Sequence, residues 1–286
     1  MGELVVAAVQ MRSGVVPEAN IAVMDDLVRQ AASRGARYVQ TPEMTGAVQK
    51  NRAGLQSILK PEADDPVLRA ASALAGELGI YLHIGSTAVD VGDGMAANRG
   101  MVFGPDGAAL ARYDKIHMFD VDLDNGESWR ESAVYRPGEV AQTVDLDGAR
   151  LGMGICYDVR FPHLFRDLAL AGADILTAPA AFTRQTGEAH WHVLQRARAI
   201  ENGAFVISAA QGGVHEDGRE TYGHSLIVDP WGRVIAEAEG DAPGVVTASL
   251  SLDEVKAARA KIPNLKNARD YRVETEMLSE TGVRVA

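Results

Sequence analysis

The stretch "GARLGMGICYDVRFPHLF" (Gly148–Phe165) contains Cys156, the only cysteine in the 286-residue chain. An apolar run with glycines at positions 152 and 154 precedes the cysteine, and a segment with helical spacing of apolar residues follows it, with Pro162 near its start. We therefore predict that Cys156 lies at a turn between a strand and a helix. Such a turn holds a side chain at the end of a sheet, where a backbone N–H just after it can face a developing oxyanion.

Strands and helices alternate in the first part of the chain. A short apolar run, Leu4–Val9, precedes a helical pattern that "SRG" (33–35) closes, and "ARYVQTPE" (36–43) reads as a second strand. A second helix, "DDPVLRAASALAGELG" (64–79), leads into the strand "IYLHIGSTAV" (80–89). This alternation predicts a layered α/β fold.

Two segments break the alternation and indicate β-hairpins. The first, "AANRGMVFGPDGAALARY" (96–113), reads as two strands joined by a turn in which Pro105 fixes φ and Gly107 permits a positive φ. The second, "SLIVDPWGRVIAEA" (225–238), repeats this arrangement. Hairpins within an alternating pattern predict mixed sheets covered by helices, and the number of apolar segments favours two sheets in one large domain.

The composition excludes several classes of partner. The chain has 28 Lys and Arg against 39 Asp and Glu, and its net charge of -11 argues against nucleic acids and anionic membranes, because both bind basic surfaces. A lone cysteine forms no internal disulfide, and "MGELVVAAVQMRSG" (1–14) has neither the basic region nor the long apolar region of a signal peptide. We expect a cytoplasmic protein with no membrane role.

Two charged residues stand at the ends of predicted strands. Glu43 ends "YVQTPE" and Lys115 follows "ARYD", and strand ends of α/β folds commonly carry site residues. Taken alone, each is better interpreted as a solvated surface charge, and Cys156 reads equally well as a small buried apolar residue. A reactive cysteine needs a base to take its proton and a cation to stabilise the negative charge, and these two residues supply both.

Four motifs together resemble the nitrilase, or carbon-nitrogen hydrolase, superfamily, whose members share a Glu-Lys-Cys triad. They are "TPEMTG" (41–46), "YDKIHMFDVD" (113–122), "ESAVYRPG" (131–138) and "GICYDVRFP" (154–162). The resemblance implies an α/β fold in the form of a four-layer αββα sandwich, with two mixed sheets flanked by helices. It covers a carbon-nitrogen hydrolase domain at 1–262 and leaves a C-terminal tail at 263–286, whose role stays open.

The resemblance also implies a mechanism, and the chemistry of the side chains agrees with it. Glu43 would take the proton of Cys156 as general base, and the thiolate would attack an amide carbon. Lys115 and the backbone N–H of Tyr157 would stabilise the oxyanion. The amine would leave, and water activated by Glu43 would hydrolyse the thioester. This chemistry needs no metal and no organic cofactor.

A second glutamate often accompanies this triad between the lysine and the cysteine. Two residues of "DNGESWRESAVYRPG", Glu127 and Glu131, are candidates. We favour Glu131 as the fourth catalytic residue, because it is followed by Ser132 and then by Pro137 and Gly138, as in the family's arrangement. The alternative is a solvated loop carboxylate.

Two late segments, "TGEAHWHVLQRARAIENGAFVISAAQ" (186–211) and "TYGHSLIVDPWG" (221–232), resemble the amidase branch. This branch contains deaminated glutathione amidases and omega-amidases, and the "AAQ" at 209–211 favours the former. The implied reaction is hydrolysis of deaminated glutathione to 2-oxoglutarate and cysteinylglycine. The alternatives are an omega-amidase acting on 2-oxoglutaramate, an N-carbamoyl amino-acid amidohydrolase and a nitrilase.

The carboxylate of such a substrate calls for an anion partner, and arginine has the bidentate geometry that suits one. Arg160 is the first candidate, and a structural ion pair with Asp158 or another nearby carboxylate is the equal alternative for it. Arg184 is a weaker candidate. We expect the helix "EAHWHVLQRARAIEN" (188–202) to pack Trp191, Leu194 and Ala197 inward. On the resemblance, His190 of this helix borders the substrate pocket.

Other classes of function remain as alternatives. His190 and His192 could suggest a metal-dependent hydrolase, but residues two apart on a helix point in different directions and do not easily chelate one ion. A catalytically silent binding protein is a second alternative, although Glu43, Lys115 and Cys156 are all present. By resemblance, we expect a homodimer or a larger homo-oligomer.

Overall fold

The computed structural model describes residues 3–123, 126 and 128–275. It contains two six-stranded sheets. The first is built from β1 (Leu4–Gln10), β2 (Tyr38–Gln40), β3 (Tyr81–Asp90), β4 (Ala96–Phe103), β5 (Ala109–Asp114) and β16 (Gly244–Leu250). The second is built from β8 (Gln142–Leu146), β9 (Ala149–Met153), β10 (Ile175–Thr177), β11 (Phe205–Ser208), β14 (Leu226–Val228) and β15 (Val234–Glu237).

The two sheets have the same pairing pattern. The first has the order β16-β1-β2-β3-β4-β5 and the second the order β8-β9-β10-β11-β14-β15. In each, the second, third and fourth strands are parallel and the outer pairs are antiparallel. The predicted hairpins are confirmed as β4–β5 and β14–β15, and the turn of the first contains Gly107 with φ of 79°. The expectation of two mixed sheets is therefore confirmed.

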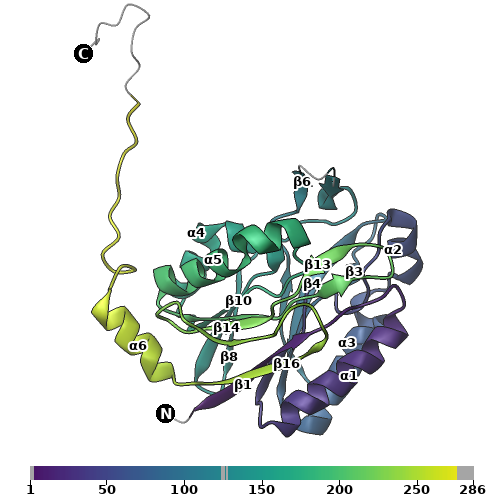
Figure 1. The fold of residues 1–286 in the computed structure, drawn as a ribbon, viewed down its shortest axis with the longest axis horizontal. Coiled ribbons are helices and arrows are strands. Elements are labelled where there is room, and N and C mark those ends of the chain that lie inside the picture. The colour runs from purple at the N-terminus through teal and green to yellow at the C-terminus, as the bar shows by residue number, and fades with distance from the viewer. Residues whose placement is uncertain (1–2, 124–125, 127, 276–286) are drawn as a thin grey trace, which may run out of the picture.

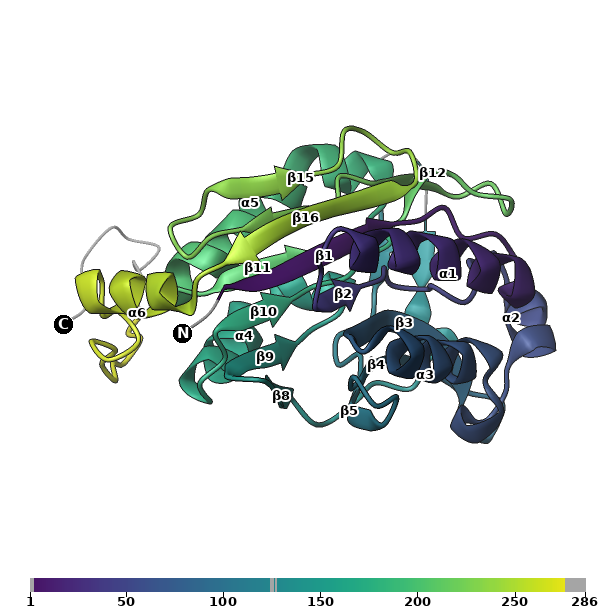
Figure 2. The same ribbon diagram turned by 90° about the horizontal axis from the view of Figure 1, so that it is seen from below.

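Helices cover the outer faces of the paired sheets, as Figures 1 and 2 show. The helices are α1 (Pro17–Ser33), α2 (Arg52–Ile58), α3 (Pro66–Leu78), α4 (Pro162–Leu170), α5 (Arg184–Asn202) and α6 (Leu252–Lys261). Helices α1 and α3 lie against the first sheet, and α4 and α5 lie against the second. The result is the four-layer αββα sandwich that the motifs predicted. None of the helices in the described residues combines the length and the apolar character needed to cross a bilayer.

Alternation along the strands builds two apolar layers. In β1, Val6 and Ala8 face the second sheet, whereas Ala7 and Val9 face the helices on the outside. The outer layer is completed by helix residues at helical spacing, such as Met24, Leu27, Val28 and Ala31 of α1. The core between the sheets therefore fixes how their strand ends face one another.

Helix α5 differs from its predicted inward face. Trp191 is buried, as expected, but Leu194 and Ala197 are only half-buried. Polar side chains, Gln195, Arg198 and Asn202, take the buried positions instead. Gln195 accepts a hydrogen bond from Ser208 on β11, and Arg198 Nε donates to the carbonyl of Val159 at 2.8 Å. Leu194 packs against the core from its half-buried position, as expected, whereas the expected inward position of Ala197 was wrong. The long-range hydrogen bonds of the polar side chains help to decide which side of the helix is buried.

Candidate active site

Cys156 lies where β9 ends and a short 3₁₀ helix, η3 (Cys156–Arg160), begins, just before α4. This confirms the predicted strand-to-helix turn. The backbone of Cys156 has φ of 48°, a left-handed conformation that is rare for residues other than glycine. Its N–H donates to the carbonyl of Pro179 at 2.9 Å, and the residue is 7% exposed. This turn places the thiol at the end of the second sheet.

Glu43 follows β2 of the first sheet and is 4% exposed. Its Oε1 accepts hydrogen bonds from Lys115 Nζ at 2.8 Å and from Asn98 Nδ2 at 2.9 Å. Its Oε2 accepts from the backbone N–H of Ala181 at 2.9 Å, and the carboxyl also bonds with the thiol of Cys156. Every one of these partners is distant in the sequence, so the fold orients this carboxylate from several directions.

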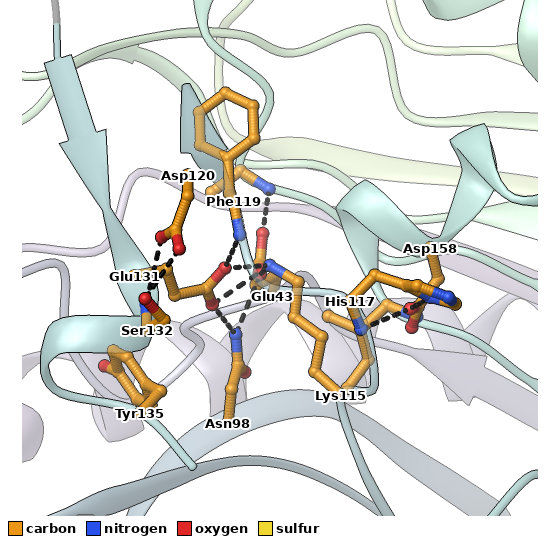
Figure 3. Close-up of polar contacts among 12 residues, drawn as sticks. Glu43, Asn98, Lys115, His117, Phe119, Asp120, Glu131, Ser132, Tyr135 and Asp158 are labelled. Carbon is orange, nitrogen blue, oxygen red and sulfur yellow. Dashed lines mark hydrogen bonds and ion pairs between the residues drawn. The ribbon is translucent and has the colours of Figure 1, made fainter. Parts of the chain in front are cut away.

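Lys115 follows β5, and its ammonium lies between two carboxylates (Figure 3). Besides Glu43, its Nζ donates to Glu131 at 2.9 Å and 3.0 Å. The side chain is 2% exposed, so this cation is held away from water by fixed partners. The structure thus brings together Glu43, Lys115, Glu131 and Cys156, which the sequence predicted as one site.

Burial and charge act in opposite directions on these groups. Burial raises the pKa of the Glu43 carboxyl, but the charge of Lys115 and the hydrogen bonds of Cys156 and Ala181 outweigh it and lower the net pKa. Burial lowers the pKa of Lys115, but the carboxylates of Glu131 and Glu43 raise it well above its usual value. Burial and the negative charge of Glu43 raise the pKa of the Cys156 thiol, against the opposing effect of Lys115. The resting site therefore holds a carboxylate, an ammonium and a neutral thiol.

Glu131 begins a second 3₁₀ helix, η2 (Glu131–Ala133), and its carboxylate is fully engaged. It accepts from Lys115, from Asn98 Nδ2 at 3.0 Å and from the backbone N–H of Phe119 at 2.6 Å (Figure 3). The other candidate for this role, Glu127, lies outside the described residues. The alternative of a solvated loop carboxylate does not fit, because the side chain is 11% exposed and bonded on both oxygens.

Asn98 is a site residue that the sequence did not reveal. It lies within β4 and its Nδ2 bridges Glu43 and Glu131. An asparagine inside a strand carries no local signal of this role. Only the pairing of β4 with its neighbours brings its amide between the two carboxylates.

Asp158 stabilises the turn that carries Cys156. Its carboxylate accepts from Tyr113 Oη at 2.6 Å, from the backbone N–H of Ile155 at 2.9 Å, and from the backbone N–H of His117 at 3.1 Å. The imidazole Nδ1 of His117 also lies 2.6 Å from it. Asp158 is completely buried and bonds to these partners. Within the described residues it forms no ion pair with Arg160, so that alternative for Arg160 is not found.

Arg160 instead faces the catalytic cavity. This cavity, of about 450 Å³, is lined by Glu43, Lys115, Cys156, Glu131, Tyr157 and Arg160 together with aromatic side chains including Phe119, Trp129 and Phe182. The Arg160 guanidinium lies 5.3 Å from the centroid of the Phe182 ring, and burial lowers the pKa of Arg160. A desolvated arginine in this position is suited to bind an anionic ligand.

Two further predicted residues lie outside this cavity wall. His190 is exposed on α5, and its Nδ1 lies 3.3 Å from Nη1 of Arg160, a residue of the cavity wall. Arg184 lines a neighbouring cavity and pairs with Glu188 at 3.2 Å and Glu220 at 3.8 Å.

One group of described residues has the composition of a metal site. His192, His224 and Glu237 place potential ligand atoms within 4.8 Å of one another. Each imidazole lies within 2.8 Å of the same oxygen of Glu237, and that carboxylate alone accounts for the arrangement as hydrogen bonds. None of the three lines the catalytic cavity.

Comparison with known proteins places this geometry in a family. The profile of the carbon-nitrogen hydrolase family matches residues 5–260. The chain is 38% identical over 267 residues to a deaminated glutathione amidase of Yersinia enterocolitica, covering 92% of each protein. It is 34% identical over 271 residues to omega-amidase NIT2 of Homo sapiens, covering 95% of this chain and 97% of that protein.

Solved structures of similar fold belong to the same group of proteins. The NitFhit protein of C. elegans superimposes with a TM-score of 0.86 at 33% identity, over 94% of this chain and 66% of that one. Nit3 of Saccharomyces cerevisiae, a member of branch 10 of the nitrilase superfamily, superimposes with a TM-score of 0.80 at 28% identity, over 91% of this chain and 94% of that one. The matched residues include the strand ends that carry Glu43, Lys115 and Cys156. The chain therefore belongs to the carbon-nitrogen hydrolase family.

Proposed function

We propose that this protein is a cysteine-dependent amidase that hydrolyses deaminated glutathione to 2-oxoglutarate and cysteinylglycine. The observation that carries the proposal is the placement of Glu43, Lys115 and Cys156 in the wall of one cavity, with Glu43 bonded to Lys115 at 2.8 Å. This is the arrangement that nucleophilic attack by a thiol requires. Relatives named deaminated glutathione amidase, at 37% to 38% identity, support the substrate.

The first step is a proton transfer within the site. The resting site combines one ammonium, Lys115, with two carboxylates, Glu43 and Glu131, beside a neutral thiol. Removing the thiol proton to solvent would add another negative charge to a buried site. Passing it from Cys156 to Glu43 leaves the total charge unchanged, so the thiolate forms without that cost as it attacks the substrate.

The next steps form and cleave a thioester. A carbon–sulfur bond forms between the amide carbon and Cys156 Sγ, and the carbonyl oxygen becomes an oxyanion that Lys115 Nζ and the N–H of Tyr157 stabilise. Glu43 returns its proton to the amine as the carbon–nitrogen bond breaks. Glu43 then takes a proton from water, which attacks the thioester carbon, and the departing thiolate recovers that proton. No metal or organic cofactor enters these steps.

Arg160 is the proposed partner of the keto-acid carboxylate. Its guanidinium lines the same cavity as the thiol. Tyr157 and His190 have supporting roles in substrate binding. Tyr157 provides its N–H and an aromatic wall, and His190 orients Arg160 through their 3.3 Å contact.

The second candidate function is an omega-amidase, which the 34% identity to NIT2 supports. Hydrolysis of N-carbamoyl amino acids would use the same catalytic groups.

To separate these functions, purified protein is assayed against deaminated glutathione, 2-oxoglutaramate and an N-carbamoyl amino acid, with Cys156→Ala as the control. A higher kcat/KM for deaminated glutathione supports the proposal, and a higher value for either other substrate replaces it. Full activity of Cys156→Ala would overturn the mechanism itself.

Three further properties belong to the same proposal. We assign residues 1–262 to the catalytic domain and 263–286 to a tail, because the family profile ends at 260 and α6 ends at Lys261. We expect a homodimer or larger homo-oligomer, because the apolar side chains of Val193 and Ile200 on α5 are 68% and 52% exposed and a second subunit would cover them. Light scattering coupled to size exclusion tests this. A cytoplasmic location also stays a prediction.

A further inference from the structure

A second cavity, of about 570 Å³, lies next to the catalytic cavity. The two cavities share Lys50, Trp129 and Arg219 in their walls. Trp129 belongs to β7 (Ser128–Arg130), and Arg219 directly precedes β13 (Glu220–Tyr222). A substrate held at Cys156 therefore has room to extend past these three residues.

The catalytic cavity is rich in cations although the chain carries a net charge of -11. Its wall has six basic side chains, Lys50, Arg52, Lys115, Arg130, Arg160 and Arg219, and two acidic ones, Glu43 and Glu131. Both acidic side chains bond to Lys115. Arg130 pairs with Asp122 at 2.9 Å. The four other basic side chains, Lys50, Arg52, Arg160 and Arg219, favour a ligand with more than one anionic group.

Arg219 is held in place at the junction of the two cavities but has few hydrogen-bond partners. Its Cζ lies 4.3 Å from the centroid of the Trp129 ring, and its side chain is 17% exposed. Its buried Nε makes no hydrogen bond in the described part of the chain, and its contact with Asp217 Oδ2 is long, at 4.0 Å. Its Nη2 makes one hydrogen bond of 3.4 Å to the carbonyl of Gln49. A guanidinium has five N–H donors, so within the described residues most of those of Arg219 lack a hydrogen-bond partner.

The neighbouring charges have other roles. Asp217 Oδ1 accepts the backbone N–H of Arg219 at 2.9 Å and so shapes the turn that presents this arginine. Arg184, the other arginine of the second cavity, is neutralised by Glu188 and Glu220. Of the two arginines that line the second cavity, Arg219 is thus the one that lies where the two cavities meet and does not pair closely with a carboxylate.

We propose that Arg219, with Lys50 from the same two walls, forms a subsite for the carboxylate of the amine leaving group. The inference rests on the proposed function, in which Arg160 holds the acyl half. A leaving group that is an amino acid or a dipeptide carries a carboxylate that can reach the junction, whereas ammonia carries none. The subsite therefore selects amides of amino acids or short peptides over primary amides.

Binding of the dipeptide alone tests the subsite independently of turnover. Cysteinylglycine and its C-terminal amide, kept reduced, are titrated calorimetrically into wild type, Arg219→Gln and the matched control Arg184→Gln. We expect wild type and Arg184→Gln to bind the acid at least about tenfold more tightly than the amide, because the contact is a charge-assisted pair. Arg219→Gln should lose this preference, and Arg219→Lys should keep part of it. Circular dichroism checks that each variant is folded.

Absence of the preference in wild type, or its survival in Arg219→Gln, would overturn the subsite. Kinetics separate that failure from failure of the proposed function. Arg219→Gln should raise KM for deaminated glutathione about tenfold and leave kcat/KM for 2-oxoglutaramate within about twofold. Equal losses on both substrates would show a general structural role and would also overturn the subsite. If wild type does not hydrolyse deaminated glutathione, the proposed function fails, and the dipeptide titration still decides the subsite.

Discussion

Lys115 Nζ lies 2.8 Å from Glu43 Oε1, and the two side chains are 2% and 5% exposed. A buried ion pair of this kind is costly to break, because removing one partner leaves the other charge uncompensated. In this site the ion pair lowers the pKa of Glu43 and raises the pKa of Lys115. Both charges also act on the pKa of the Cys156 thiol. A substitution that tests these roles should therefore keep the shape of the side chain and change only its charge or its ability to bind a proton.

Glu43→Gln should abolish base catalysis while keeping the site packed. The amide has nearly the same shape as the carboxylate, and Lys115 keeps its partner Glu131, but a glutamine cannot take the proton of Cys156. We expect kcat to fall by about 10²- to 10⁴-fold, measured by steady-state kinetics. Glu62→Gln is the control, because Glu62 pairs with Arg99 away from the catalytic cavity and its variant should stay active. Near-normal kcat in Glu43→Gln would exclude Glu43 as the base.

Asn98→Asp should move the acid limb of the kcat/KM profile to higher pH. The variant places a third carboxyl where the Asn98 amide now donates to Glu43 and Glu131. Added negative charge raises the pKa of Glu43, so this base becomes protonated at a higher pH than in wild type, by about one unit or more. Asn98→Ala removes the amide without adding charge, so its acid limb should move less. Superimposable profiles for wild type and Asn98→Asp would show that Asn98 does not act on the protonation of the site.

Gly85→Ala should lower both stability and activity. Gly85 lies in β3, and a Cβ at this position would be 2.2 Å from the carbonyl oxygen of Thr41 and 2.6 Å from the carbonyl carbon of Pro42. These backbone atoms lead directly to Glu43, so relief of the clash displaces the base. We expect a loss of about 1–3 kcal/mol in the free energy of unfolding by urea titration, with a lower kcat. Gly244→Ala is the control, since its Cβ would meet open space, and a similar loss there would contradict this explanation.

His83 should make the protein acid-sensitive below pH 6.5. Burial lowers the pKa of this imidazole to about 3, from a usual value of 6.5. Between these values the unfolded chain binds a proton that the folded one does not, so stability decreases as pH falls through this window. From His83 alone, we expect a loss of about 2 kcal/mol between pH 6.5 and pH 5 in urea denaturation.

The matched variants isolate this contribution. His83→Gln should show a shallower decline of stability over the same pH range, whereas His163→Gln, which changes an exposed imidazole, should follow wild type. Parallel curves for wild type and His83→Gln would contradict the assignment.

Local patterns predicted the elements that carry the site. The glycine-spaced apolar run and Pro162 placed Cys156 at its turn, and the Pro105–Gly107 segment placed a hairpin between β4 and β5. These signals are local, because apolar periodicity and turn residues act within a few positions of the chain. The same reasoning was right about Trp191 and Leu194 of α5 but wrong about Ala197, because polar side chains that bond to other elements take buried positions on that helix.

The sequence by itself determined the alternation of strands and helices, the two hairpins and the identity of the residues at the strand ends, including Glu43, Lys115 and Cys156. The tertiary structure alone decided which groups complete the site. Ala181 reaches Glu43 across 138 positions, Asn98 bridges Glu43 and Glu131, and Asp158 bonds elsewhere than to Arg160. The physical reason is that these contacts depend on how the two sheets face one another, and the packing of the core between them sets that arrangement only when the whole chain is folded.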